Sequence, residues 1–146
     1  MVVLCTAMHI LSFTSHLNSE WILKDFLLKD DINLPNGRIL VFATNQTLKI
    51  LARAKALSAD GTFKICPKLW GQVMILCAEV GLGIWVPVLF ALLPDKKSQS
   101  YLAFFQSVKQ CLANISESLA AKYIMIDFEI AIREMCMEVF PNVSDF

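Results

Sequence analysis

The longest apolar stretch of the chain runs from Val73 to Leu93 and carries a single charged residue, Glu79. About 20 apolar residues are enough for a helix to cross a bilayer, so one interpretation of this stretch is a membrane-spanning helix. Two glycines near its middle and Pro87 disfavour a continuous helix, whereas its β-branched and aromatic residues favour strands. We therefore predict two strands, Gln72–Val80 and Ile84–Leu92, joined by a glycine-containing turn.

A different pattern follows the predicted hairpin, with apolar residues at steps of three and four. These residues are Tyr101, Phe104, Phe105, Val108, Leu112 and Ile115. The pattern predicts an amphipathic helix that begins near Ser98 and packs this stripe against a core. Further on, the apolar run Tyr123–Ile126 predicts a strand that ends on Asp127. A last helix is expected over about Ile130–Val139, because Pro141 cannot continue it.

The first half of the chain has weaker patterns. The expected elements are a helix over Glu20–Leu28 capped by Ser19, turns over Asp30–Gly37, a strand over Arg38–Ala43, a helix from Thr44 or Asn45 to about Leu57, and a strand over Phe63–Ile65. From this last strand onward, the order is strand, strand, strand, helix, strand, helix. Such an order indicates an α/β fold.

Composition limits the classes to which the protein can belong. The chain has 146 residues, of which 56% are hydrophobic and 18% charged, so it fits one domain with a substantial core and not a disordered chain. Its formal net charge is zero, without the marked basic excess of most DNA-binding domains. The five cysteines are widely spaced and form no Cys-x-x-Cys motif, which favours reduced thiols inside a cell over a zinc site. Met1–Phe13 is apolar but has no basic start, so we do not expect secretion.

The dipeptide Asp60-Gly61 offers the first candidate chemistry. An Asp-Gly pair most often marks a turn. Here it opens the β-branched and aromatic run Thr62-Phe63-Lys64-Ile65, and Gly61 would allow another backbone to approach closely. A carboxylate at the start of a buried strand needs a partner, and a metal ion is a common one. The residues alone leave both interpretations open.

Several motifs together resemble the catalytic domain of Mutator-like element (MULE) transposases. They are Asp60-Gly61-Thr62-Phe63, then Pro67 with Trp70 and Gln72, the run Pro87–Lys96, Tyr101 with Phe104-Phe105, and Asp127-Phe128-Glu129 followed by Phe140-Pro141. Each motif is short, but all five occur in the family's order. The resemblance covers residues 38–141 and divides the chain into an N-terminal extension, 1–37, and a partial transposase domain, 38–146.

The resemblance implies a ribonuclease H-like fold and a metal-dependent site for DNA cleavage and strand transfer. In that fold, three antiparallel strands precede a helix and a fourth strand that lies parallel to the first. Asp60 and Asp127 would then meet and hold Mg²⁺ or Mn²⁺, since paired carboxylates favour a hard divalent cation. Asp60 would bridge two metal ions and Asp127 would hold one of them. An alternative role for Asp127 is the N-cap of the helix that follows.

Glu129 has two interpretations as well. If the strand before it continues, its side chain shares a face with Asp127 and joins the metal site. If the helix begins at once, Glu129 instead favours the helix dipole or pairs with Arg133, four residues on.

The sequence also departs from the family pattern. The family's third catalytic acid and its Cys/His pair lie downstream of the Phe-Pro motif, and neither occurs after Pro141. We therefore expect a truncated transposase domain that binds metal weakly and is not active alone. The resemblance implies DNA as a partner and the nucleus as the location. Two alternatives are a domesticated binding module without catalysis and a small membrane protein spanning the bilayer at 73–93.

Overall fold

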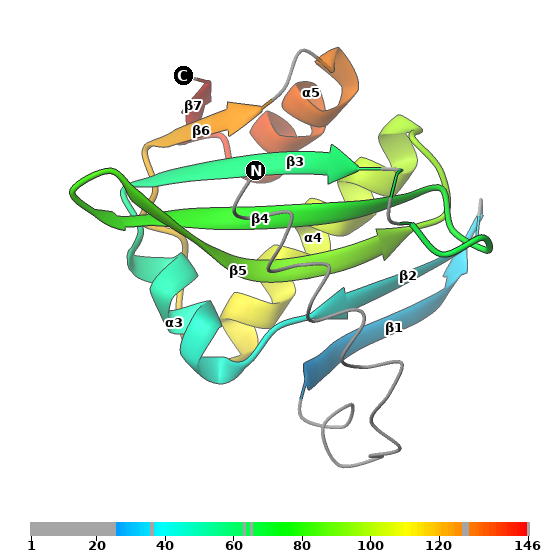
Figure 1. The fold of residues 1–146 in the computed structure, drawn as a ribbon, viewed down its shortest axis with the longest axis horizontal. Helices are drawn as coiled ribbons and strands as arrows, with labels where there is room; N and C mark the ends of the chain where they lie inside the picture. Colours follow the sequence, from blue (N-terminus) through cyan, green and yellow to red (C-terminus); the bar gives the residue numbers. More distant parts are fainter. Residues whose placement is uncertain (1–25, 36, 63, 65, 127–128, 146) are drawn as a thin grey trace.

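The computed structural model describes residues 26–35, 37–62, 64, 66–126 and 129–145. Its elements are β1 (Leu27–Leu34), β2 (Gly37–Phe42), α3 (Asn45–Arg53), β3 (Ala56–Thr62), β4 (Gln72–Gly81), β5 (Ile84–Leu93), α4 (Ser98–Asn114), β6 (Tyr123–Ile126), α5 (Ile130–Val139) and β7 (Ser144–Asp145). The seven strands form one mixed sheet in the order β1-β2-β5-β4-β3-β6-β7 (Figure 1). The expected α/β class is confirmed.

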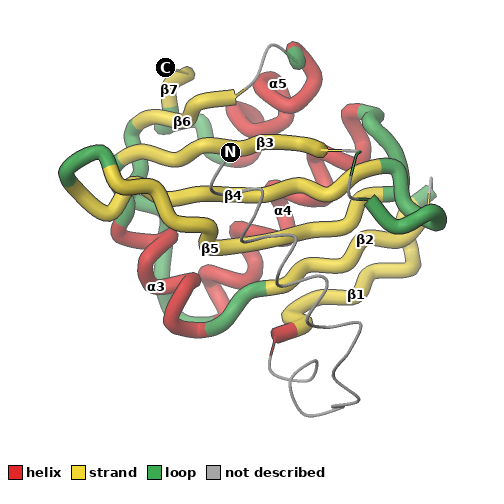
Figure 2. Tube along the Cα trace, viewed as in Figure 1, coloured by secondary structure: helices red, strands yellow, loops and turns green. Residues whose placement is uncertain are grey.

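The central hairpin is β4–β5, and it confirms the strand interpretation of the apolar stretch. Leu82 and Gly83 at its tip have φ angles of 56° and 72°, which suit the twist of a tight hairpin. The Glu79 carboxylate accepts a hydrogen bond from the Gly83 amide at 3.3 Å. The hairpin extends past the neighbouring strands in the tube view (Figure 2). The predicted alternative of one helix over 73–93 is wrong, and no helix in the described part of the chain is long and apolar enough to cross a membrane.

Each face of the sheet buries its own apolar cluster. In β4, alternate residues such as Met74 and Leu76 join the main core beneath the helices, as expected for a strand's two-residue period. Val73 and Ile75 belong to a second cluster on the opposite face. Helices α4 and α5 lie behind the sheet in Figure 1 and cover the main core. A hairpin covered on both faces explains why its sequence is almost uniformly apolar.

The later elements agree closely with the sequence predictions. Helix α4 begins at Ser98, and the predicted stripe is buried from Tyr101 to Leu112. Strand β6 pairs parallel to β3, as expected. Helix α5 spans Ile130–Val139 with Phe140 as its C-cap, just before the proline.

Several predictions in the first half are wrong where the structure describes them. Helix α3 has the expected Thr44 cap but ends at Arg53, so Leu57 lies in a strand. The reason is long-range: Ala56–Thr62 pairs with β4 on one side and with β6 on the other, which outweighs weak local preferences. Lys64, in the expected strand Phe63–Ile65, lies in a turn, while Phe63 and Ile65 are outside the described residues.

The start of the sheet differs from prediction too. Leu27 and Leu28, expected at the end of a helix, belong to β1, and residues 20–25 of that helix lie outside the described part. Asp30 and Asp31, expected in a turn, also lie in β1. The Arg38 guanidinium on β2 donates two hydrogen bonds to the Asp30 carboxylate, at 2.6 and 2.5 Å, which compensates an acid in the edge strand.

The buried face of α4 gives a direct test of this packing. Phe105 is 1% exposed, and its ring lies 5.0 Å from that of Phe104 and 6.4 Å from that of Phe140. We expect Phe105→Ala to lower the free energy of unfolding by about 3–5 kcal/mol, because it leaves a cavity in the core. Urea unfolding followed by circular dichroism measures this loss. The control is Leu69→Ala, at a residue 94% exposed, which should change stability by less than about 0.5 kcal/mol. A loss below about 1 kcal/mol for Phe105→Ala would contradict the packing.

Candidate functional site at the carboxyl end of β3 and β6

The parallel pair β3–β6 brings distant parts of the chain together. Its register pairs Leu57 with Ile124 and ends with Ala59 opposite Ile126. The next residue on β3 is Asp60. The next residue after Ile126 in the sequence is Asp127, which lies outside the described residues. The structure therefore places one predicted acid directly and describes the partner strand up to the residue before the other.

Asp60 lies near the end of β3, not at the start of a strand as expected. It pairs with Ile75 across the antiparallel ladder, so its side chain shares the face of Ile75 and the second apolar cluster. Asp60 itself is exposed. Burial raises the pKa of the Cys77 thiol on the neighbouring strand to about 11, and the negative charge of Asp60 contributes to the rise. This effect is consistent with a carboxylate on the Cys77 face of the sheet.

Gly61 serves close packing and not a turn. It lies within β3, opposite Met74. A Cβ atom at position 61 would come within 2.4 Å of the Gln72 Oε1 atom. The close approach at Gly61 is therefore made by a buried side chain and not, as predicted, by another backbone.

A chain of hydrogen bonds runs behind Gly61, on the helix side of the sheet. The Tyr101 hydroxyl donates to Glu129 Oε1 at 2.9 Å and accepts from Gln72 Nε2 at 3.0 Å. Gln72 Nε2 also donates to the Asp95 carbonyl at 3.1 Å. These directions are forced, because a carboxylate and a carbonyl only accept, so the amide nitrogen of Gln72 must face both partners. Gln72 Oε1 is buried and has no hydrogen-bond partner in the described part of the chain.

The Tyr101 hydroxyl is a permanent donor in this chain of bonds. Its residue is fully buried, and burial raises the pKa of the hydroxyl above its ordinary value. The bond from Gln72 lowers the pKa somewhat, whereas the Glu129 carboxylate raises it further. The hydroxyl therefore stays protonated at neutral pH.

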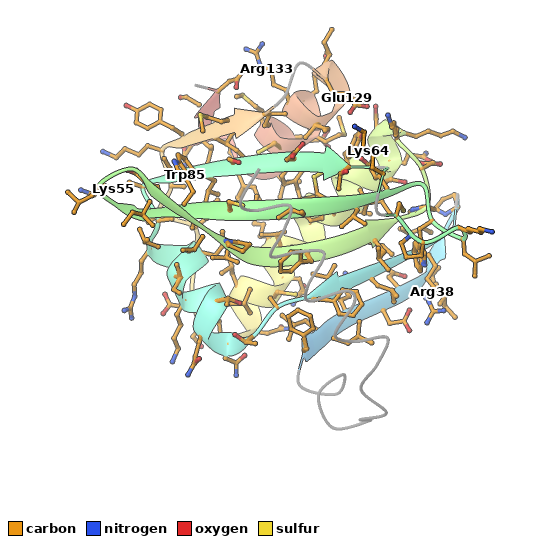
Figure 3. All side chains as sticks on the ribbon, viewed as in Figure 1. Arg38, Lys55, Lys64, Trp85, Glu129 and Arg133 are labelled. Carbon is orange, nitrogen blue, oxygen red and sulfur yellow. The ribbon has the colours of Figure 1, made fainter. Side chains whose placement is uncertain are left out.

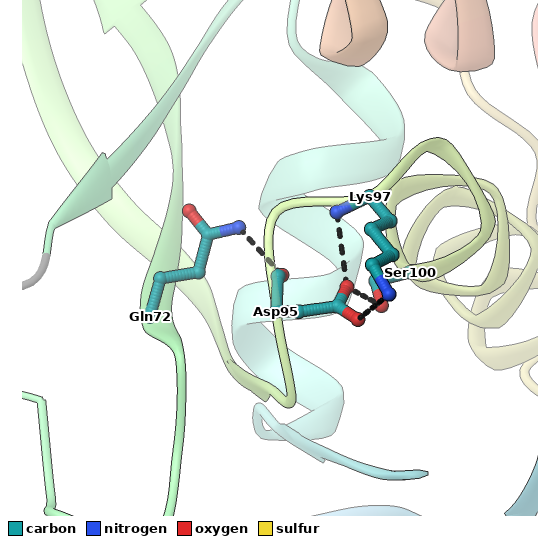
Figure 4. A network of polar contacts seen from close by, with 4 residues as sticks. All are labelled: Gln72, Asp95, Lys97 and Ser100. Carbon is teal, nitrogen blue, oxygen red and sulfur yellow. Dashed lines mark hydrogen bonds and ion pairs between the residues drawn. The ribbon is translucent and has the colours of Figure 1, made fainter. Parts of the chain in front are cut away.

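Asp95 connects these bonds to the start of α4. Its carboxylate accepts hydrogen bonds from the Lys97 amide at 2.9 Å and from the Ser100 hydroxyl at 2.7 Å, while its carbonyl accepts from Gln72 (Figure 4). The N-cap residue Lys97 makes no side-chain cap bond of its own. Asp95 thus bonds to the backbone of the N-cap residue and to a side chain in the first turn of α4.

Glu129 begins α5 and does not extend β6. It is the N-cap residue of α5, so the helix starts later than an N-cap at Asp127 would require. Of the two predicted interpretations, the structure agrees with the second, in which Glu129 begins the helix and does not continue the strand. Arg133, however, pairs with Asp145 at 3.1 Å and not with Glu129. Glu129 and Lys64 lie at the same end of the molecule in Figure 3, opposite Lys55 and Trp85.

Sequence reasoning missed the roles of Gln72 and Tyr101. Gln72 was predicted only as a motif residue at the start of a strand, and Tyr101 only as part of a motif and of an apolar stripe. A signal was present in both places: an amide at the start of an otherwise apolar strand, and a tyrosine among phenylalanines. Buried polar groups such as these need partners, which predicts that they meet.

The described residues contain no group of three or more His, Cys, Asp or Glu side chains placed to hold a metal ion. The free thiols Cys66, Cys77, Cys111 and Cys136 form no disulfide in that part of the chain. Asp127, the second predicted acid, lies outside those residues.

The packing at Gly61 can be tested by a double-mutant cycle. We expect Gly61→Ala to lower the free energy of unfolding by about 1–3 kcal/mol, because the new methyl group displaces Gln72 from its two hydrogen bonds. Chemical denaturation of the parent, both single variants and the double variant measures the coupling. In the Gln72→Ala background the close contact is gone and Met74 Cε lies at an ordinary contact distance of 3.7 Å, so the cost of the methyl group should fall by at least about 1 kcal/mol. An equal cost in both backgrounds would contradict the contact.

Comparison with known proteins completes the description of this region. A family model described as the MULE transposase domain matches residues 56–145, which is more than half of the chain. The match begins at the first residue of β3 and includes every element from β3 to β7. No curated protein and no solved structure matches the chain.

Proposed function

The chain belongs to the MULE transposase domain family, and on that premise we propose that it provides two carboxylates, Asp60 and Asp127, of a metal-dependent site for DNA cleavage and strand transfer. DNA is then the partner, and the nucleus is the expected location. The family match supports the transposase origin. The assignment of the two acids rests on the register of β3 and β6.

The sheet topology supports a ribonuclease H-like core, which we propose as the fold. Strands β3, β4 and β5 are consecutive and antiparallel. After α4, strand β6 joins β3 in parallel, and after α5, strand β7 joins β6 in parallel. The order β5-β4-β3-β6 is the arrangement that the family resemblance implies, with β7 added beside β6 and the β1–β2 hairpin added at the β5 edge.

The observation that carries the proposal is the final pair of the β3–β6 ladder. Ala59 faces Ile126, so one further step along both strands joins Asp60 and Asp127. Neighbouring strands lie about 4.8 Å apart, a separation at which two carboxylates share a cation readily. We expect the register to continue by this one step.

The donor set fits a hard divalent cation. Asp60 is exposed at the end of its strand, so a hydrated ion can reach its carboxylate. Carboxylate oxygens are preferred ligands of Mg²⁺ and Mn²⁺, and two such groups leave most of the coordination shell to water. When bound, such a cation stabilises charge on the phosphate oxygens during phosphoryl transfer. With only two acids, we expect weak binding and no strand transfer by the isolated chain.

Strand β3 and the packing behind it hold Asp60 in position for the proposed cation. Asp60 is held by a strand paired on both sides, so its backbone is rigid. Gly61 allows buried Gln72 to pack directly behind it. Asp60 thus comes from an ordered strand, which suits a site that must hold fixed geometry.

We predict that the chain binds Mn²⁺ weakly and that Asp60→Asn and Asp127→Asn each abolish binding, since one carboxylate alone holds the ion poorly. Titration followed by the electron paramagnetic resonance signal of free Mn²⁺ measures the affinity. Asp31→Asn is the matched control, because Asp31 is a half-buried acid on β1, an edge strand that does not pair with β3. Equal binding by the parent and the Asp60→Asn variant would contradict the site.

An assay with labelled duplex DNA separates binding from catalysis. We expect no Mn²⁺-dependent cleavage by the parent chain, because two carboxylates leave a second metal ion without a firm ligand. Nicking that depends on Mn²⁺ and is lost in both Asp60→Asn and Asp127→Asn would show that this chain is an active nuclease on its own. Nicking that survives both substitutions would show contamination and not this site.

A further inference from the structure

We propose that Tyr101 is a positioning residue for the second acidic segment, and that Glu129 is its anchor point and not a metal ligand. Through the hydrogen bond to Glu129, α4 holds the start of α5 and so the adjoining Asp127. This inference rests on the proposed function for the role of Asp127. The hydrogen bond itself, however, can be tested without any metal.

The donor side of this contact is rigid. Tyr101 is 0% exposed and sits on the long helix α4 within the main core. Its hydroxyl is fixed by a second bond, from Gln72 Nε2, whose other hydrogen goes to the Asp95 carbonyl. Strand β4, the turn after β5 and the first part of α4 therefore all fix the position of this one oxygen.

The acceptor side is a helix start that lacks its usual cap. Glu129 occupies the N-cap position of α5, yet its side chain makes no cap hydrogen bond. The first turn of α5 contains no acidic residue either. The Glu129 carboxylate instead accepts the bond from Tyr101, at 2.9 Å. The start of α5 is thus tied to α4 by a side chain and not by a cap of its own.

The two faces of the sheet separate Glu129 from Asp60. Gln72 bonds to the same hydroxyl as Glu129. Because successive side chains of a strand point to opposite faces, Gln72 points to the face of Met74 and the helices, opposite to Val73. Asp60 points to the other side, with Ile75. The carboxylate of Glu129 is therefore engaged behind the sheet, and the site of Asp60 is in front of it.

Coupling to Asp127 follows from the length of the connection. Glu129 is two residues from Asp127, and two residues span at most about 7 Å. Strand β6 fixes the chain on the other side, since Ile126 pairs with Ala59. On the C-terminal side of Asp127, the Tyr101 bond holds Glu129.

Substitutions at Glu129 distinguish an anchor from a ligand. Glu129→Gln keeps an oxygen that accepts from Tyr101 but removes the charge that a metal ligand needs. Glu129→Ala removes both. Tyr101→Phe removes the donor and leaves the ring in the core. If Glu129 is an anchor, Glu129→Gln resembles the parent, whereas Glu129→Ala and Tyr101→Phe resemble each other.

The first measurement is amide hydrogen exchange of the metal-free chain by nuclear magnetic resonance. We expect Tyr101→Phe and Glu129→Ala each to speed exchange of the amides of residues 129–133 by about tenfold, the size expected for a hydrogen bond to a charged group. Their double variant should be no faster than either single one. Ser107→Ala is the matched control, because it removes a buried hydroxyl from the same helix that bonds only to Ala103. Unchanged exchange in Glu129→Ala overturns the inference, even if Tyr101→Phe fails to fold.

The second measurement is Mn²⁺ affinity of the same variants. We expect about a tenfold loss in Tyr101→Phe and Glu129→Ala, and less than a twofold loss in Glu129→Gln and Ser107→Ala. A loss in Glu129→Gln as large as that in Asp60→Asn would make Glu129 a ligand and overturn the inference. Parent-like affinity in Tyr101→Phe would overturn it as well. Absence of Mn²⁺ binding by the parent chain would contradict the proposed function, and the exchange measurement would then decide on the anchor alone.

Discussion

The pairing of β3 with two partners is the constraint on which the rest of the structure depends. Strand β3 lies between β4, its antiparallel neighbour, and β6, a parallel strand from the last third of the chain. A parallel partner requires a crossover connection, and α4 provides it while covering the main core. Because of this pairing, Asp60 and the end of β6 at Ile126 lie at the same end of the sheet. The site that we propose depends on this pairing.

Behind the sheet, a few buried polar groups determine how the helices sit. An unpaired polar group in a core is costly, so Gln72 and Tyr101 favour the arrangement in which their bonds to Asp95 and Glu129 are made. Apolar packing alone would tolerate small shifts of α4 and α5 across the sheet. The hydrogen bonds remove this freedom. Gly61 belongs to the same set, since a larger residue would displace Gln72. The apolar core thus stabilises the fold, and the hydrogen bonds of Gln72 and Tyr101 favour one position of the helices at this end of the sheet.

Much of this fold could be predicted from local pattern, and the exceptions have a common cause. The β4–β5 hairpin, α4 and α5 have strong periodicity or turn signals, so local sequence decides them. Strand β3 has none: Leu57 and Ser58 become strand because they pair on both sides. Asp60 was found through its motif, but its position at the end of a strand depends on that pairing. The Tyr101–Glu129 bond joins residues 28 apart, and only the packing of α4 against α5 brings them together.

The central claim is that Asp60 and Asp127 share one cation on the face of the sheet opposite the helices. A crystal structure of the chain grown with Mn²⁺ tests it most directly, because anomalous scattering locates the ion independently of the protein atoms. We predict one ion about 2 Å from a carboxylate oxygen of each acid, the distance expected for a small hard cation. Carboxylates more than about 10 Å apart, or an ion held by other residues, would contradict the claim.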